Sequence, residues 1–533
     1  MQQIEDCLYF YQQAIERAPA MSQELANIKL KRGIMFTKNG NFKKAIDDFS
    51  EALSVKSEKL QFFDLYLERG KAYRKVGEIE LSIADISMCF ELQKNNTKPK
   101  ILASAFSELG LSFFIKGQLE EAIDRFSKAI ELDPNQALYF NYRGKANTAL
   151  CYFEQAEIDF NQALNLDPSS LTFLHNRGLN ALASGDGEEA LNDIEIALQG
   201  DPENSEFIFS KGRAYLVKKN YEQAKNLFIQ SVQINKNPEV LIELGQVLYK
   251  LNLYEEALMY TNQLLELVLD DYNAIHLKAL IQKSLKNYSD ALISLEKAIE
   301  LNPSDNILRF EQGECLLKLK RVDEAIEALT CCAELNGEDY TIYKLLGLAH
   351  RQKGEYNKSL HYFNFGLKQD PNRADFLMER SQLYTKMENY DLAEKDLTHI
   401  LEKQSNSLVY YRLAVVSYLS NDFSKVVSLV NIAHEQGIPD ECRLHSLYIL
   451  GLSLANLEQY DKALPPLNEA ILISPNETVL YHERAKCLLL VDNFDLAIDD
   501  FTKVIENQPT NSHAYFGRGF AYKNILKFKH AVR

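Results

Sequence analysis

The amino-acid sequence predicts an all-α chain in which about fifteen helix–turn–helix repeats stack into a solenoid. The first observation is a small residue that recurs along the whole chain; of its fourteen intervals, nine are 34 residues, two are 33, two are 37 and one is 40. A second small residue follows twelve positions later, and a bulky one sixteen positions later. A fixed period of this length is the signature of a repeat architecture. The recurring small residues are Gly33, Gly70, Gly110, Gly144, Gly178, Gly212, Gly245, Ala279, Gly313, Gly347, Ser381, Ala414, Gly451, Ala485 and Gly519.

Each half-repeat predicts one amphipathic helix, because apolar residues recur at i, i+3, i+4 and i+7. The small residue, counted here as repeat position 8, lets the two helices of a hairpin approach closely. Turn sequences such as 38–41 and 184–187 end the first helix, and a proline such as Pro134 or Pro168 ends the second. Neither helix can bury its apolar stripe alone, so neighbouring repeats must stack.

This pattern resembles the tetratricopeptide repeat family, with an aromatic residue, Leu-Gly, Ala-x3-Phe and a closing proline at a period of 34. The clearest copy is 137–168, and the resemblance covers nearly the whole chain. Tryptophan is absent, and Arg309 once replaces the leading aromatic residue. The resemblance implies a right-handed superhelix whose first helices line the concave face with repeat positions 2, 5, 6, 9, 12 and 13.

Breaks in the 34-residue period predict that the chain is divided into four parts. Residues 1–22 form an N-terminal half-repeat helix, residues 26–93 hold repeats 1 and 2, residues 103–436 hold the most regular repeats 3 to 12, and residues 444–533 hold repeats 13 to 15. The last repeat stops at Ala531-Val532-Arg533, early in its second helix. Because an uncapped end exposes apolar surface, we expect the protein to continue beyond Arg533 or a partner to cover this end.

Composition and motifs exclude several functions. The net charge of −16 argues against a nucleic-acid binder. The eight cysteines form no Cys-x-x-Cys pair, which favours small buried thiols in a reduced cytoplasmic setting over a metal site. No signal peptide, membrane-length apolar run, phosphate loop, His-Glu-x-x-His or nucleophile elbow is present. We therefore predict no catalytic, cofactor-binding or metal-binding residues; Cys442, His445 and His434 read better as a polar loop than as metal ligands.

An internal correlation predicts a pair of charges inside individual hairpins. Arginine occupies position 7 in seven repeats, and aspartate follows sixteen residues later wherever that residue is encoded, and in no other repeat. A guanidinium can meet a carboxylate bidentately while its stem packs between helices. The predicted structural pairs are Arg32–Asp48, Arg69–Asp85, Arg143–Asp159, Arg177–Asp193, Arg380–Asp396 and Arg484–Asp500.

Acidic residues recur on the predicted inner face. The alternative to a binding stripe is local pairing within one helix, as between Glu68 and Lys71 or between Glu483 and Lys486. The candidate partner-binding residues are Glu68, Glu108, Glu243, Glu311, Glu379 and Glu483 at position 6, with Asp64, Glu206, Glu239 and Asp375 at position 2.

Two groove chemistries of the family are not matched. The carboxylate clamp for chaperone tails needs lysine at position 5 with asparagine at position 9, then asparagine at position 6, then lysine at 2 with arginine at 6. Lys344 is the one lysine at position 5, position 9 never holds asparagine, and Arg412 lacks a lysine at position 2. The asparagine ladder of the O-linked N-acetylglucosamine transferase arm needs asparagine at position 6 repeatedly, and only Asn176 qualifies.

We therefore predict a non-catalytic scaffold or adaptor whose concave groove binds protein segments of basic or amphipathic character. The partners are not chaperone tails of the clamp type, nucleic acid or membrane. Two alternatives stay open at this point. The chain could be the recognition arm of a larger enzyme that continues beyond residue 533, or a structural subunit of a ciliary or transport assembly, for which fold analogy is the sole support.

Overall fold

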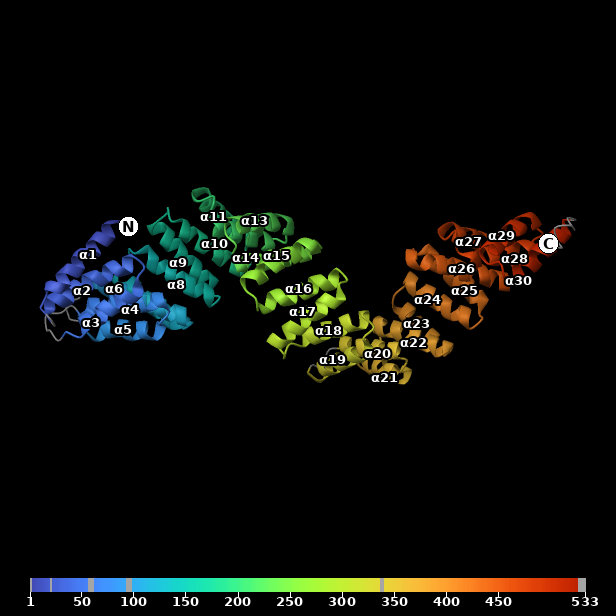
Figure 1. The fold of residues 1–533 in the computed structure, drawn as a ribbon, viewed down its shortest axis with the longest axis horizontal. Helices are drawn as coiled ribbons and strands as arrows, with labels where there is room; N and C mark the ends of the chain where they lie inside the picture. Colours follow the sequence, from blue (N-terminus) through green and yellow to red (C-terminus); the bar gives the residue numbers. More distant parts are fainter. Residues whose placement is uncertain (1, 20–21, 56–61, 93–97, 336–339, 526–533) are drawn as a thin grey trace. The chain divides into compact units, whose positions relative to one another are not determined.

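The computed structural model describes residues 2–19, 22–55, 62–92, 98–335, 340–525 of the chain, and within them the secondary structure is entirely helical. The all-α solenoid of helix–turn–helix repeats predicted from the period is confirmed. Figure 1 shows the helices following one another in pairs. By its internal contacts the chain forms two compact units, Met1–Leu277 (unit 1) and Lys278–Arg533 (unit 2).

The helices of unit 1, with the boundary helix α16, have the following bounds: α1 Gln2–Arg17, α2 Gln23–Lys38, α3 Phe42–Leu53, α4 Phe62–Val76, α5 Ile79–Glu91, α6 Pro99–Lys116, α7 Leu119–Leu132, α8 Ala137–Ala149, α9 Phe153–Leu166, α10 Leu171–Ser184, α11 Gly187–Gly200, α12 Ser205–Val217, α13 Tyr221–Ile234, α14 Pro238–Lys250, α15 Tyr254–Leu267 and α16 Tyr272–Ser284.

The helices that follow in unit 2 are α17 Tyr288–Leu301, α18 Asn306–Lys318, α19 Val322–Leu335, α20 Tyr340–Lys353, α21 Tyr356–Gln369, α22 Ala374–Lys386, α23 Tyr390–Lys403, α24 Ser407–Leu419, α25 Phe423–Glu435, α26 Asp440–Asn456, α27 Tyr460–Ile473, α28 Thr478–Leu490, α29 Phe494–Asn507 and α30 Ser512–Asn524.

The even-numbered helices are the first helices of the repeats, and the odd-numbered ones from α3 onward are the second helices. The predicted N-terminal half-repeat is α1, which packs on α2. The final residues 531–533, where we expect a second helix to begin, lie outside the described residues, as do residues 56–61 and 93–97, which fall at two of the breaks in the period. A third break, near residues 435–441, falls at the link between α25 and α26.

The recurring glycine determines how closely the two helices of a hairpin approach. A Cβ placed on Gly144 would lie 2.8 Å from Cε1 of Phe160, whose ring is buried in the facing helix α9. That separation is well below van der Waals contact, so the aromatic ring occupies the space that a side chain would need. Position 8 is therefore small because position 24 is large.

The turn inside each hairpin has one conformation throughout the described repeats. The residue at position 15 has a positive φ whether it is glycine, as at Gly117 and Gly185, or a larger residue, as at Lys219 and Glu388. A left-handed residue at this place ends a helix by redirecting the chain. Nine repeats adopt it without glycine, which costs conformational energy.

Within each unit the first helices gather on one side. Helices two apart in the chain touch where both are first helices, as α8 with α10, α10 with α12, and α24 with α26. The first helices therefore form the inner face of each unit, and the second helices form the outer face. This arrangement places repeat positions 5 and 6 of successive repeats beside one another on the inner face.

Candidate partner-binding groove

The six position-6 glutamates lie on the inner face but are not free charges. Each is at most a quarter exposed at its side chain and lies within ion-pair distance of a cation. Two pairs are local, Lys71–Glu68 at 2.8 Å and Lys486–Glu483 at 2.7 Å, as in the alternative considered from the sequence. The other four join consecutive first helices: Arg74–Glu108, Arg213–Glu243 at 3.4 Å, Lys283–Glu311 at 4.0 Å and Arg351–Glu379 at 2.8 Å.

Burial and charge act on these carboxyl groups in opposite directions. Burial raises the pKa of Glu243 above its ordinary value, although Arg213 opposes the shift. At position 2, burial also opposes ionisation of Asp375, but hydrogen bonds from Arg373 and Lys344 lower its pKa overall. A paired and partly buried glutamate presents less negative potential to a ligand than its formal charge suggests.

The remaining position-2 acids differ from this pattern. Asp64, Glu206 and Glu239 make no ion pair among the described residues, and Glu206 and Glu239 are exposed. Burial, followed by repulsion from Glu68, raises the pKa of Asp64. The structure thus places all ten predicted residues on the inner side of first helices without bringing them together into one acidic site.

The structure places each of the six predicted arginines against its aspartate. In the hairpin of α8 and α9, Arg143 donates from Nη2 to Oδ1 of Asp159 at 2.7 Å and from Nε to Oδ2 at 3.0 Å, and the aspartate side chain is only 3% exposed. The other five pairs repeat this bidentate geometry: Arg32–Asp48, Arg69–Asp85, Arg177–Asp193, Arg380–Asp396 and Arg484–Asp500.

Sequence reasoning missed a third partner of these arginines. The Nη1 of Arg143 donates to the hydroxyl of Ser127 in the preceding repeat at 3.0 Å, and Arg177 donates to Asn161 at 2.6 Å. A similar contact is made sixteen residues before the arginine by Arg380 to Asn364, Arg484 to Asn468 and Arg518 to Thr502, and nineteen residues before it by Arg69 to Ser50. Arg69, Arg143, Arg177, Arg380 and Arg484 therefore each join three helices, and the recurring Ser, Asn or Thr was a signal that could have revealed it.

Between α8, α10 and α12, the contacts that join position 5 of one repeat to position 6 of the next are made by uncharged side chains instead of ion pairs. The Nδ2 of Asn176 donates to Oδ1 of Asn141 at 2.8 Å, and a hydrogen bond of 2.8 Å joins Nε2 of His175 to Oγ of Ser210. Both bonds connect position 5 of one repeat with position 6 of the next. We call these two contacts the neutral rungs. Their 35-residue spacing is visible in the sequence, although only Asn176 was considered there.

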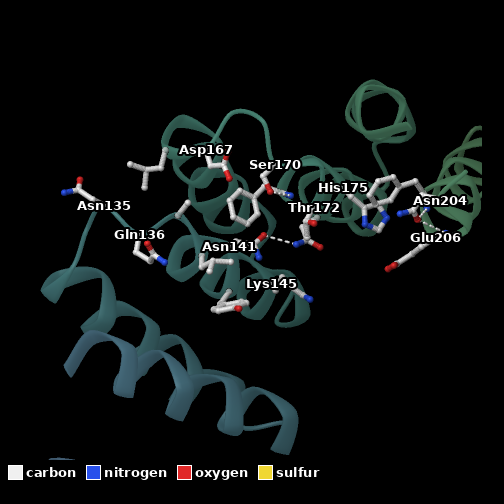
Figure 2. Close-up of a pocket in the computed structure, with 17 residues that line it drawn as sticks. Asn135, Gln136, Asn141, Lys145, Asp167, Ser170, Thr172, His175, Asn204 and Glu206 are labelled. Atoms are coloured by element: carbon white, nitrogen blue, oxygen red, sulfur yellow. Dashed lines mark hydrogen bonds between the residues drawn. The ribbon is translucent and has the colours of Figure 1, made fainter. Parts of the chain in front are cut away.

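A groove of about 760 Å³ opens above the neutral rungs. Figure 2 shows Asn141, Lys145, Thr172, His175 and Glu206 among the side chains that line it. Leu138, Phe173 and Phe207 contribute apolar surface, but polar and charged side chains make up most of the lining. Directed polar groups in a groove fix the orientation of a bound ligand.

His175 stays uncharged in this groove. Burial, reinforced by the charge of Lys145, lowers the pKa of His175 to about 4. The imidazole is therefore neutral at physiological pH and serves as a hydrogen-bonding group toward Ser210. The lining also carries Lys145, which has no ion-pair partner among the described residues, together with the acidic residues Asp167 and Glu206.

Two polar groups of the first rung are left for another molecule. Within the described part of the chain, no hydrogen bond reaches Nδ2 of Asn141 or Oδ1 of Asn176, and neither atom is sealed from solvent. An amide donor and an amide acceptor side by side match the acceptor and donor of a peptide group.

The described residues hold no group of three or more histidine, cysteine or acidic side chains placed to bind a metal ion. His434 instead bonds Ser446 at 2.9 Å, and His445 bonds Tyr411 at 2.9 Å. All eight cysteines are free thiols. None of the described helices combines the length and the apolarity that a membrane crossing requires.

A solenoid of paired helices with this period defines a class of repeat proteins. A family profile described as TPR repeat matches residues 110–150, and profiles described as tetratricopeptide repeat match residues 181–235, 277–330, 344–407 and 444–477. The chain belongs to the tetratricopeptide repeat proteins, as the resemblance predicted. Proteins of this family generally mediate protein–protein interactions as scaffolds, and the repeat fold is typically non-catalytic.

Individual relatives are distant. TPR repeat-containing protein YpiA of Bacillus subtilis is 23% identical over 296 residues, covering 55% of this chain and 69% of YpiA. TPR repeat-containing protein MJ1428 of Methanocaldococcus jannaschii is 24% identical over 304 residues, covering 57% of this chain and 50% of that protein. Among solved structures, the Cut9–Hcn1 hetero-tetramer of APC/C matches with a TM-score of 0.34 and 13% identity, covering 94% of this chain and 96% of the matched chain.

Proposed function

We propose that this chain is a non-catalytic, cytoplasmic scaffold that holds an extended segment of a partner protein in the groove of α8, α10 and α12. The observation that carries the proposal is the open amide pair of Asn141 and Asn176 at the floor of that groove. An extended segment exposes peptide groups at regular intervals, and amide side chains bind such groups without requiring a charge. The unpaired thiols support a reducing compartment.

The groove lining also suggests the character of the segment. The sequence alone favoured a basic or amphipathic partner, because six glutamates recur on the inner face. In the structure those glutamates have cation partners, whereas the groove offers amide, hydroxyl and imidazole groups with Leu138, Phe173 and Phe207. These features support an amphipathic segment in which polar and apolar side chains alternate, more than a strongly basic one.

The test uses a photo-crosslinking amino acid placed singly in the full-length chain. One site is Thr172 in the groove, and the matched control is Gln155, which is exposed on the outer helix α9. Crosslinking in cells followed by mass spectrometry should give partner peptides attached at Thr172. Partner peptides attached only at Gln155 would refute groove binding.

A double variant, Asn141→Ala with Asn176→Ala, separates recognition from folding. Removing both members of the rung leaves neither buried amide without its partner, so the chain should stay folded. Loss of two hydrogen bonds to the ligand, each worth about 1 kcal/mol, should weaken partner binding roughly 30-fold. Circular dichroism and the melting temperature check the fold, and unchanged crosslinking at Thr172 would contradict the proposed role of the amide pair.

A further inference from the structure

Four arginines occupy inner-face positions of the described first helices, and three of them are neutralised by a glutamate of the following repeat. Arg74 pairs with Glu108, Arg213 lies 3.4 Å from Glu243, and Arg351 lies 2.8 Å from Glu379. These three pairs show what the fold ordinarily supplies to an arginine on this surface, namely a carboxylate from the next first helix.

The fourth arginine, Arg412, has no such partner. It lies at position 6 of α24, the position that six other repeats fill with glutamate. Among the described residues no carboxylate and no hydrogen-bond acceptor reaches its guanidinium, although its Nε is sealed from solvent. A half-buried guanidinium with an unsatisfied donor is unfavourable. Its two Nη atoms are not sealed from solvent, so they can donate to an acceptor from another molecule.

The neighbours of Arg412 keep the site singly positive. The hydroxyl of Tyr411 and Nδ1 of His445 are joined by a hydrogen bond of 2.9 Å. Burial, followed by the positive charge of Arg412, lowers the pKa of His445 below its ordinary value, so the imidazole is neutral near pH 7. Arg412 therefore provides the positive charge at this point of the inner face. His445 lies close enough for that charge to lower the pKa of its imidazole.

An open cavity adjoins the site. His445 lines a cavity of about 390 Å³ whose other walls are the apolar residues Leu444, Tyr448, Val479 and Leu480, with Glu441 and Glu477 also in the lining. The two glutamates repel an anion inside the cavity, so a carboxylate ligand belongs on the side of Arg412. An apolar side chain next to that carboxylate can fill the cavity itself.

We propose that Arg412 anchors a second partner-binding site, on unit 2, for a peptide that carries an aspartate or glutamate beside a bulky apolar residue. The carboxylate accepts hydrogen bonds from the guanidinium, an arrangement that is bidentate and directional. The site differs from the carboxylate clamp considered above, because it depends on one arginine and an apolar cavity without a lysine at position 2. It is independent of the groove in unit 1.

The experiment selects peptides from a random library displayed on phage against the full-length chain, Arg412→Met and Arg412→Glu. The native chain should enrich peptides with an acidic residue next to an apolar one. A synthetic peptide of that selected sequence should bind Arg412→Met at least tenfold more weakly, and Arg412→Glu should instead enrich basic residues. The double variant Asn141→Ala with Asn176→Ala should bind the peptide as the native chain does, which separates this site from the groove of unit 1.

Melting temperatures distinguish a role of Arg412 in peptide binding from a purely structural role. Arg412→Met should leave the melting temperature unchanged or raise it, because it removes an unpartnered cation. Arg351→Met is the matched control and should lower the melting temperature, because it leaves Glu379 without its cation. Equal losses in the two variants, or acidic peptides that bind Arg412→Met as well as the native chain, would overturn the proposal. So would a selection in which the native chain enriches no acidic residue.

Discussion

At the scale of single residues, the same inner-face positions have two different chemistries. Glu243 and Glu379 are held by arginines of the preceding repeat, whereas Asn176 and Ser210 are held by uncharged side chains of theirs. A charged pair binds its own partner strongly and offers little to a ligand. An amide retains a donor or acceptor after making one bond. This difference is why we locate the binding groove at the neutral rungs.

His175 makes the stability of unit 1 depend on pH. Its pKa is about 4 in the folded chain, below the ordinary value of 6.5, so the unfolded chain binds more protons between these two values. Stability should therefore be complete above about pH 6.5 and fall by about 3 kcal/mol as the pH decreases to about 4.

Chemical denaturation of the native chain and of His175→Gln at pH 4.5 and pH 7.5 measures this contribution. The native chain should lose more stability between the two pH values than the variant does. His434, His445 and His482 also have lowered pKa values, mainly through burial, so the variant should retain part of the dependence. Identical pH profiles for the two proteins would show that His175 is not the group responsible.

At the scale of helices and hairpins, position-7 arginines such as Arg143 link their own two helices and the preceding second helix. We predict that Arg143→Leu alone costs several kcal/mol, on the order of 3, because Asp159 is left buried without a cation. Combined with Asp159→Leu, the same substitution should cost much less, since no charge then remains buried.

Denaturant unfolding of the two single variants and the double variant completes a thermodynamic cycle for this pair. The hairpin of α14 and α15 provides a natural comparison, because it has Leu244 and Tyr260 at the corresponding positions. A double variant that loses as much stability as the sum of both single variants would mean that the two side chains are not coupled.

The turn inside the hairpin offers a stabilising change. Lys219 is exposed and adopts a φ of 58°, where repeats such as that of α10 and α11 have glycine. Because a side chain strains this conformation, Lys219→Gly should raise stability by up to about 1 kcal/mol. The opposite change, Gly185→Lys, should lower it by a similar amount. Melting temperatures of both variants check the prediction, which is wrong if Lys219→Gly melts below the native chain.

At the scale of the whole molecule, helices contact mainly their neighbours in the chain, so perturbations should stay local. A Cβ at Gly451 in α26 would lie 2.6 Å from Cγ of Leu467 in α27. Gly451→Ala should therefore accelerate amide hydrogen exchange in α26, α27 and the adjoining helices. It should leave exchange in α8 to α12 unchanged.

Hydrogen exchange with mass spectrometry resolves these segments. Gly144→Ala is the reciprocal control, because it should affect α8 to α10 and spare α26 to α28. Faster exchange along the entire chain in either variant would show that the repeats unfold as one cooperative body. Local effects would also allow the groove of unit 1 and the Arg412 site to be tested separately.

Much of the fold could be read from particular residues. The spacing of Gly144, Ala156 and Phe160 identifies both helices of a hairpin, because each residue type satisfies a steric need within a single repeat. The pairing of Arg143 with Asp159 was equally visible, since the two residues change together along the chain. The ion pairs that neutralise Glu108 and Glu243 could not be predicted from the sequence, because the arginines that form them lie about thirty residues earlier and have no fixed spacing.

The sequence by itself determined the helices, the hairpins and the aspartate that pairs with a position-7 arginine, because those depend on distances within one 34-residue unit. Only the tertiary structure decided which inner-face groups are satisfied and which are open. That distinction depends on how one repeat is offset from the next, and side chains such as Asn141, Asn176 and Arg412 acquire or lack a partner according to that offset.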